Sequence, residues 1–361
     1  MIMFPAAMSR TERVVLFIAL IFIIIIAVKM TAFIVTIFIM ALILALLALP
    51  GLFWLKNKGL SDFHAVLILT AGATLVVLGF IFLTILSFHT LLADLPLYQA
   101  ELNLRLQEIS AILSSMGISS ITNGTPTINL SDILSMGLVG AMSIVEGIMF
   151  LFFVGVTTFF MLLDAPNISA RLEQRFGKDS ETMQQFSRMT GYIIDFIVVR
   201  TETNFVHGCL FGSFLGIMGV HGAILWGVLT FLLGYIPYFG LVIAAVPAIF
   251  FAWIQFGIPG AVAVIAAVCV LNLIVENPVY SYLAARKFDM PALIVIVSVI
   301  FWGWLLGLVG MLFAIPITLL VLLFFQMCDD LRWINIVLGV GHLFDEIGGG
   351  KEVKAPPAQK N

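Results

Sequence analysis

Long apolar runs alternate with shorter polar stretches along most of the chain. In the first part the runs cover residues 14–28, 31–54, 65–88 and about 136–163, with Lys29 dividing the first two. A helix needs about 20 apolar residues, within a range of roughly 17–25, to cross a bilayer. The pattern therefore predicts four membrane-spanning helices here, the first of them short.

The second half is denser in apolar residues and more often interrupted. Its last run, 292–327, is too long for one crossing, and Gly303, Gly307 and Gly310 interrupt it, so we expect a hairpin. The earlier runs are 193–199 joined to 204–220, 223–236, 239–254 and 259–275. Short membrane segments that Gly or Pro interrupts are typical of discontinuous helices near a transport site. We predict an all-α membrane protein of about seven or eight transmembrane or re-entrant helices, with broken helices in its second half.

Two polar stretches separate the apolar ones. Within the extracytoplasmic loop 89–135, Leu102, Leu106, Ile109 and Leu113 recur at helical spacing, which predicts an amphipathic helix on the membrane surface or against a neighbour. The charged stretch 164–190 is expected to begin a cytoplasmic helix near Pro166, because proline suits the first turn of a helix. The predicted parts are 1–88 (membrane helices), 89–135, 136–163 (membrane helix), 164–190, 191–327 (glycine-rich membrane core) and 328–361 (cytoplasmic tail, partly disordered).

Composition agrees with a membrane protein and excludes several other classes. The chain is 62% hydrophobic and 10% charged, whereas soluble domains carry about 25% charged residues. No basic stripe supports nucleic-acid binding. With the amino terminus inside, 15 of the 17 basic residues fall in cytoplasmic segments, and only Lys29 and Arg105 fall outside. The positive-inside rule then places both termini in the cytoplasm and the protein in the cell membrane.

No pattern in the sequence indicates an enzyme or a cofactor. The three cysteines, Cys209, Cys269 and Cys328, lack the spacing of a zinc site or a disulfide framework. The chain contains no H-E-x-x-H, no G-x-S-x-G and no P-loop. We therefore expect a protein that is not an enzyme, binds no metal and cannot use ATP by itself.

Ionisable side chains inside apolar runs need a reason, because each costs about 2.5–3.5 kcal/mol at the centre of a membrane helix. Glu146 lies within the fourth run, and Glu276 ends a later one. Each is either functional or structural: Glu276 can reach water at a membrane edge, and a lysine can neutralise Glu146. Asn272 and Asn277 accompany Glu276.

A second group of polar residues lies at the start of the run that contains residues 193–220. Asp195 and Glu202 share one helix face, and Arg200, Asn204 and His207 share another. We expect the charged members to lie at the cytoplasmic surface, where long side chains reach water. His207 is interpreted as a helix-interface residue.

Glycine and proline mark two further features. Gly208, Gly212 and Gly216 repeat every fourth residue, which favours close helix packing in membranes. The segment 234–240, GYIPYFG, must break a helix inside the membrane, and broken backbone survives there only in protein or beside a wet cavity. Tyr235, Pro237 and Phe239 of this segment are therefore candidates for substrate or ion contact.

The segment 234–240, the following residues 241–252 and especially IFWGWLLGLVGMLFAIPIT at 300–318 resemble the autoinducer-2 exporter family of permeases. The resemblance covers most of the chain. It implies a secondary transporter, since members include an autoinducer-2 exporter and sodium(lithium)/proton antiporters, and it implies homo-oligomers of the pentameric kind. Ser281 and Ala285 stand where members often have proline and glycine, so the substrate does not transfer.

The leading hypothesis is an exporter of a small polar molecule, such as an autoinducer-2-like signal. The alternatives are a sodium(lithium)/proton antiporter and a non-transporting membrane scaffold or regulator that captures a soluble partner through residues 164–190. The expected partners are the lipid bilayer, a small-molecule or ion substrate and further copies of the chain. The candidate pathway residues are Glu146, Asp195, Asn204, Tyr235, Pro237, Phe239, Asn272, Glu276 and Asn277, and the candidate packing glycines are Gly208, Gly212, Gly216, Gly303, Gly307 and Gly310.

Overall fold

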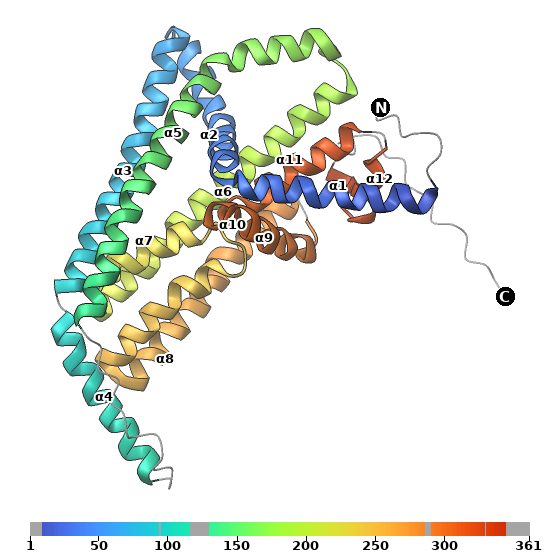
Figure 1. Cartoon of the computed structure of the whole chain (residues 1–361). Coiled ribbons are helices and arrows are strands. Elements are labelled where there is room, and N and C mark those ends of the chain that lie inside the picture. The colour runs from blue at the N-terminus through green and yellow to red at the C-terminus, as the bar shows by residue number, and fades with distance from the viewer. Residues whose placement is uncertain (1–8, 94, 116–129, 286–289, 329, 344–361) are drawn as a thin grey trace.

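A computed structural model describes the chain apart from residues 1–8, 94, 116–129, 286–289, 329 and 344–361. The described residues form helices joined by short turns, with no strand among them (Figure 1). The helices are α1 Arg10–Met30, α2 Ala32–Asn57, α3 Asp62–Ala93, α4 Leu95–Ser115, α5 Leu130–Phe176, α6 Glu181–Met218, α7 Ala223–Leu233, α8 Gly240–Ala285, α9 Ala292–Leu306, α10 Leu308–Leu312, α11 Ala314–Met327 and α12 Arg332–Val337, followed by the short 3-10 helix η1 Gly341–Leu343.

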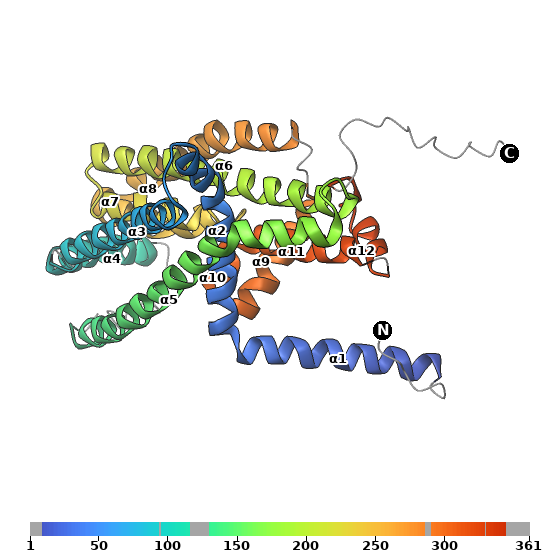
Figure 2. The same ribbon diagram turned by 90° about the horizontal axis from the view of Figure 1, so that it is seen from above.

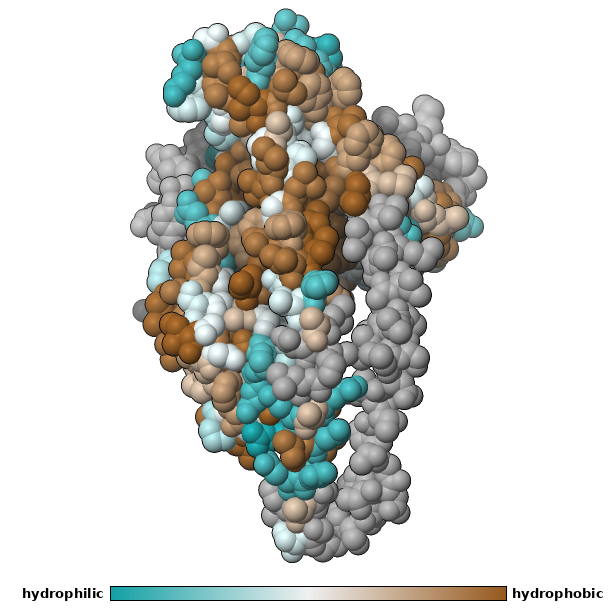
Figure 3. All heavy atoms as spheres, turned by 90° about the vertical axis from the view of Figure 1, so that its left-hand side faces the viewer, coloured by the Kyte–Doolittle hydropathy of each residue, from teal (hydrophilic) through white to brown (hydrophobic). Residues whose placement is uncertain are grey.

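Length and apolarity qualify four of these helices to cross a membrane. They lie within α2, α3, α5 and α8, and four shorter apolar helices accompany them in α1, α7, α9 and α11. Large apolar side chains such as Leu75 and Phe82 of α3 are exposed on the protein surface. Figure 3 shows apolar residues across the middle of the face that α3 and α5 form, with polar residues gathered near its ends. The predicted all-α membrane architecture is confirmed.

The helices pack as two groups. The first group consists of α2, α3 and α5, which pack together on the left of Figure 1 around Leu52, Val66 and Leu162. The second group is organised by α6. One face of α6 packs on α11, which in turn packs on α9, and another face of α6 packs on α7 and α8. Figure 2 shows α1 leaving this body as a long arm.

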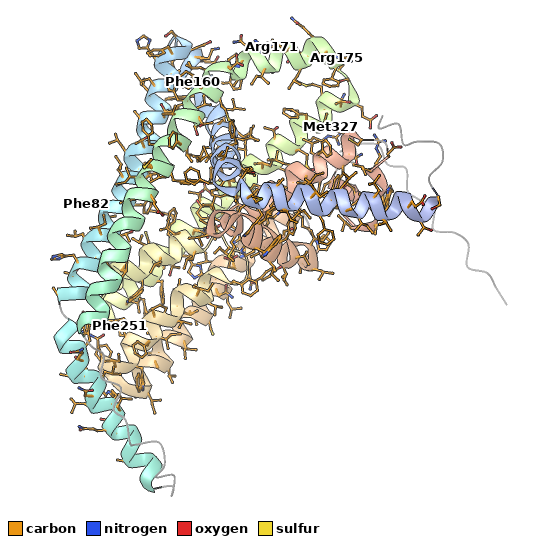
Figure 4. All side chains as sticks on the ribbon, in the orientation of Figure 1. Phe82, Phe160, Arg171, Arg175, Phe251 and Met327 are labelled. Carbon is orange, nitrogen blue, oxygen red and sulfur yellow. The ribbon has the colours of Figure 1, made fainter. Side chains whose placement is uncertain are left out.

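Basic residues gather at one end of the first group. Arg171 and Arg175 of α5 lie at the top of Figure 4, at the same level as the turn between α2 and α3. In that turn Lys56 pairs with Asp62, with 2.7 Å between Nζ and the carboxylate. Phe251 and α4 lie toward the opposite end (Figure 4). Lys56, Arg171 and Arg175, which the sequence analysis assigns to one side of the membrane, therefore lie at one end of the molecule.

Two predicted boundaries differ from the structure. No helix begins near Pro166, because α5 continues through this proline to Phe176. A proline inside a helix removes one backbone hydrogen bond, and the helix keeps the others by continuing. The charged stretch 164–190 instead divides at Gly177, whose φ of 87° ends α5, and α6 begins after the cap residue Ser180.

The amphipathic helix expected in residues 89–135 is present as α4. Leu102 and Leu106 are half-buried, and α4 packs on α8. The side chains of Ile109 and Leu113 lie outside the described part of the chain. The start of the predicted tail is ordered, because buried Asn335 of α12 donates hydrogen bonds of 3.1 Å to the Leu322 carbonyl and to Gln326 of α11. The residues expected to be disordered, from 348 onward, lie outside the described ranges.

Candidate functional site

A buried ion pair joins α6 to α8. Nη1 of Arg200 lies 3.0 Å from both carboxylate oxygens of Glu276, and the two side chains are only 4% and 17% exposed. The Arg200 guanidinium also lies 6.0 Å from the ring of Phe196. Arg200 was expected to reach the membrane surface, and this expectation is wrong. A partner on a second helix, which sequence spacing within α6 does not show, holds its charge inside the protein.

Two further polar side chains continue the same face of α6. Asn204 and His207 are one and about two turns beyond Arg200, and they are 1% and 4% exposed. Within the described part of the chain, Asn204 Nδ2 and His207 Nε2 have no hydrogen-bond partner. Because an unpaired buried polar group costs about 1–3 kcal/mol, such atoms indicate binding capacity that the described residues do not use.

The GYIPYFG segment interrupts the helical structure between α7 and α8, as predicted. Tyr238 adopts a φ of 65°, which is rare for residues other than glycine. Gly240 is needed because a side chain there would collide with the carbonyl of Leu233. We call residues 223–256 the first hairpin and residues 234–240 its tip.

Contacts with α6 fix this tip beside the polar face. The Tyr235 hydroxyl lies 2.6 Å from Oγ1 of Thr201. Gly234 packs directly on Asn204, since a Cβ atom at Gly234 would lie 2.5 Å from Oδ1 of Asn204. The absence of a side chain at position 234 therefore lets the tip approach the buried amide.

The last apolar run also folds back on itself, as its glycines predict. It divides at Gly307 and Phe313 into α9, α10 and α11, and we call residues 292–327 the second hairpin and 307–313 its tip. A side chain at Gly303 would meet Met311, and one at Gly310 would meet the carbonyl of Trp302. Trp302 Nε1 donates a 2.9 Å hydrogen bond to Thr318, which ties the two arms together.

The tips of the two hairpins meet. Ile236 of the first tip forms one apolar cluster with Val299 and Ala314 of the second hairpin. The ring of Tyr235 stacks on Phe313 with centroids 6.3 Å apart. Two broken-helix tips and a buried polar helix face therefore converge in one region.

The structure brings some of the predicted site residues together and leaves the side chains of others exposed. Asn204, Tyr235 and Glu276 belong to the convergent region, and Pro237 is buried within the first tip. The side chains of Glu146, Phe239, Asn272 and Asn277 are exposed, and Asp195 is half-buried on α6 upstream of Arg200.

Sequence reasoning gave no binding role to Arg200, Thr201, His207 or Phe313. The helical spacing of Arg200, Asn204 and His207 indicated that they share one face of α6. It carries no information about Glu276, which lies 76 residues beyond Arg200.

The packing glycines lie at close approaches between helices. A Cβ atom at Gly208 would lie 2.7 Å from the carbonyl oxygen of Gly227, and one at Gly212 would lie 3.3 Å from the Gly227 Cα. At Gly216 the nearest such contact is an ordinary 3.9 Å to Ala223. Close contact between α6 and α7 thus depends on the first two glycines.

Comparison with known proteins agrees with this architecture. The AI-2E family transporter profile matches residues 15–328. The AI-2 transport protein TqsA of Escherichia coli K12 is 30% identical over 244 residues, which cover 65% of this chain and 69% of TqsA. YhhT of the same organism is 23% identical over 304 residues (82% of this chain, 85% of YhhT), and a Haemophilus influenzae protein is 28% identical over 233 residues (63% and 67%). The chain belongs to the AI-2E transporter family and is a multi-pass membrane transporter.

Proposed function

We propose that this chain is a secondary transporter that exports a small polar molecule, such as an AI-2-like signal, past the meeting point of its two hairpin tips. The observation that carries the proposal is the contact of both tips with each other beside the buried polar face of α6. Discontinuous helices in transporters place backbone and side-chain polar groups at the substrate site. The polar groups proposed to contact the solute are those of Asn204, His207, Tyr235 and the Arg200–Glu276 pair.

The chemistry of these groups favours a polar solute without net charge. Arg200 and Glu276 neutralise each other within one ion pair. Asn204 Nδ2 and His207 Nε2 remain available for hydrogen bonds within the described residues, and Tyr235 supplies a hydroxyl. A small molecule with several hydroxyl or carbonyl groups can exchange hydrogen bonds with such a set. TqsA, whose name describes AI-2 transport, is similar to this chain and supports the same solute class.

A sodium(lithium)/proton antiporter is the second candidate. The largely buried carboxylate of Glu276 favours it, because an intramembrane carboxylate is a common proton carrier in transporters. In that case sodium or lithium would dissipate an imposed pH gradient, whereas a neutral-solute exporter would leave the gradient unaffected by these ions.

The remaining proposals concern the orientation, membrane location and oligomeric state of the protein. The distribution of basic residues supports cytoplasmic termini in the cell membrane. We also propose a homo-oligomer, with a pentamer as the form to test. Neither proposal depends on the identity of the solute.

Flux in proteoliposomes tests the function. A panel of neutral hydroxylated solutes, with sodium and lithium as separate arms, is assayed with and without a proton gradient. Protein-dependent movement of a neutral solute supports export, and cation-dependent collapse of the gradient supports antiport. Protein that moves nothing in any arm, while residues 164–190 capture a soluble partner, would overturn both in favour of a scaffold.

A further inference from the structure

Two glycine turns in the second half of the chain share one backbone conformation. Gly257 interrupts α8 with φ 69° and ψ −158°, and Gly307 separates α9 from α10 with φ 71° and ψ −151°. This positive φ favours glycine strongly. Each turn is followed three residues later by a second glycine, Gly260 and Gly310, so both turns read G-x-x-G.

The second glycine of each turn has the same structural role. A Cβ atom at Gly260 would lie 2.5 Å from the carbonyl oxygen of Ala252, and one at Gly310 would collide with the carbonyl oxygen of Trp302. Ala252 and Trp302 each lie eight positions before their glycine. The helix after each turn thus passes against the backbone of the helix before it at an equivalent point.

A basic side chain covers each turn at an equivalent carbonyl. Arg105 of α4 donates from Nε to the Ile254 carbonyl at 3.0 Å and from Nη2 to the Gln255 carbonyl at 3.2 Å. Lys29 of α1 donates from Nζ to the Trp304 carbonyl. Ile254 and Trp304 each lie three positions before the turn glycine.

The physical reason for a cation at these points is general. The last carbonyls of a helix have no partner within the helix, and the helix dipole makes this end negative. At Gly257 and Gly307 the chain turns before a further helical turn can supply hydrogen bonds to these carbonyls. Lys29 and Arg105, both in the first half of the chain, supply hydrogen bonds and positive charge there instead. Lys29 and Arg105 are also the two basic residues that the charge distribution places outside the cytoplasm.

We propose that Lys29 and Arg105 are a matched pair of positioning residues, each of which fixes one G-x-x-G turn of the second half to a helix of the first half. Arg105 thereby holds the end of the first hairpin that is remote from its tip to α4, and Lys29 holds the turn of the second hairpin to α1. Each cation acts on its own turn and not on the other. The proposal rests on these contacts and holds whatever solute the chain moves.

Spin labels placed after each turn test this pairing in the full-length protein in liposomes. Ile258 and Leu308 follow the turn glycines directly and are exposed, so each accepts a label as a single cysteine after Cys209, Cys269 and Cys328 are replaced by serine. Each label is measured in otherwise unchanged protein, with Arg105→Gln and with Lys29→Gln. Glu108→Gln is the control, because it removes the 2.9 Å ion pair of Arg105 and leaves the carbonyl contacts in place.

The proposal expects a crossed result. Arg105→Gln should remove the immobilised component of the spectrum at position 258 but not at 308, and Lys29→Gln should do the opposite. Arg105→Lys should retain part of the immobilisation at position 258 that Arg105→Gln removes. Lysine keeps the charge but lacks the planar set of donors that reaches two carbonyls. Lys29→Arg should likewise retain the immobilised component at position 308 that Lys29→Gln removes.

Two results would overturn the proposal. Equal loosening at both positions from either substitution would mean general destabilisation, and unchanged spectra would mean that the cations do not hold the turns. If Arg105→Gln cannot be purified, Arg105→Lys replaces it, with partial release at position 258 alone as the expected result and release at both positions or neither as the contradicting one.

Discussion

Arg200 of α6 donates to both carboxylate oxygens of Glu276 of α8 at 3.0 Å, although 76 residues separate them in the chain. The pair lies where α6 packs on the second part of α8, and it is largely shielded from solvent. Removing one member of a buried pair leaves an uncompensated charge, whereas replacing both by apolar residues is often neutral or stabilising. The pair therefore joins α6 to α8 and places two opposite charges inside the protein.

Arg200→Met should destabilise the protein, because it leaves the Glu276 carboxylate buried without its partner. We expect a loss of about 3–5 kcal/mol for a substitution of this kind. The double variant Arg200→Met/Glu276→Leu should recover most of this loss, measured by thermal unfolding in detergent. A double variant as unstable as Arg200→Met would show that the ion pair is not the source of the effect.

Most of the helices were predictable from the sequence, because long apolar runs leave few alternatives to a membrane helix. The glycines at 303, 307 and 310 also predicted that the last run folds back, and it does so at Gly307 and Phe313. The predicted boundary at Pro166 was wrong, because a proline inside a helix can kink the helix without ending it.

The site was only partly predictable. The polar face of α6 follows from the helical spacing of Arg200, Asn204 and His207. The partner of Arg200 and the meeting of Tyr235 with Phe313 depend on how distant helices pack, and local patterns contain no information on this. Glu146 shows the opposite case, in which an isolated charge in an apolar run has an exposed side chain.

Gly234→Ala should disturb the first tip. The added methyl group would lie 2.5 Å from Oδ1 of Asn204, so either the amide or the tip must move. Overpacking of this kind destabilises by about 1–3 kcal/mol, which a shift in Tm can report. Asn204→Ala in the same chain should relieve the clash, and failure of this second change to recover stability would argue against the contact.

Gly208→Ala and Gly216→Ala should differ, although both lie on one face of α6. A methyl group at 208 would lie 2.7 Å from a backbone carbonyl of α7, which cannot rotate away, whereas position 216 has an ordinary 3.9 Å contact. We expect a loss of about 1–3 kcal/mol at 208. At 216 we expect no loss of stability and a gain of up to about 1 kcal/mol, because alanine is more favourable than glycine inside a helix. Unfolding of the two variants under identical conditions measures the difference, and equal effects would refute the assigned α6–α7 contact.

Tyr235→Phe should weaken the attachment of the first tip to α6 without removing its ring from Phe313. The lost hydroxyl lies 2.6 Å from Oγ1 of Thr201, and a hydrogen bond of this kind contributes about 0.5–1.5 kcal/mol. Thr201→Val removes the same bond from the other side. The two changes together should cost less than the sum of the single changes in a double-mutant cycle, and strict additivity would mean that the two groups do not interact.

Solute is proposed to pass the meeting point of the hairpin tips through contact with the buried polar groups of α6 and α8. The most direct measurement is flux of an identified solute into proteoliposomes for Glu276→Gln and for Glu202→Gln, which changes an exposed carboxylate on α6. Loss of a charged hydrogen-bond partner should lower flux about tenfold or more in Glu276→Gln, with the protein still folded. Glu202→Gln should transport like the unchanged protein. Equal flux in the two variants, with normal folding of both, would contradict the claim.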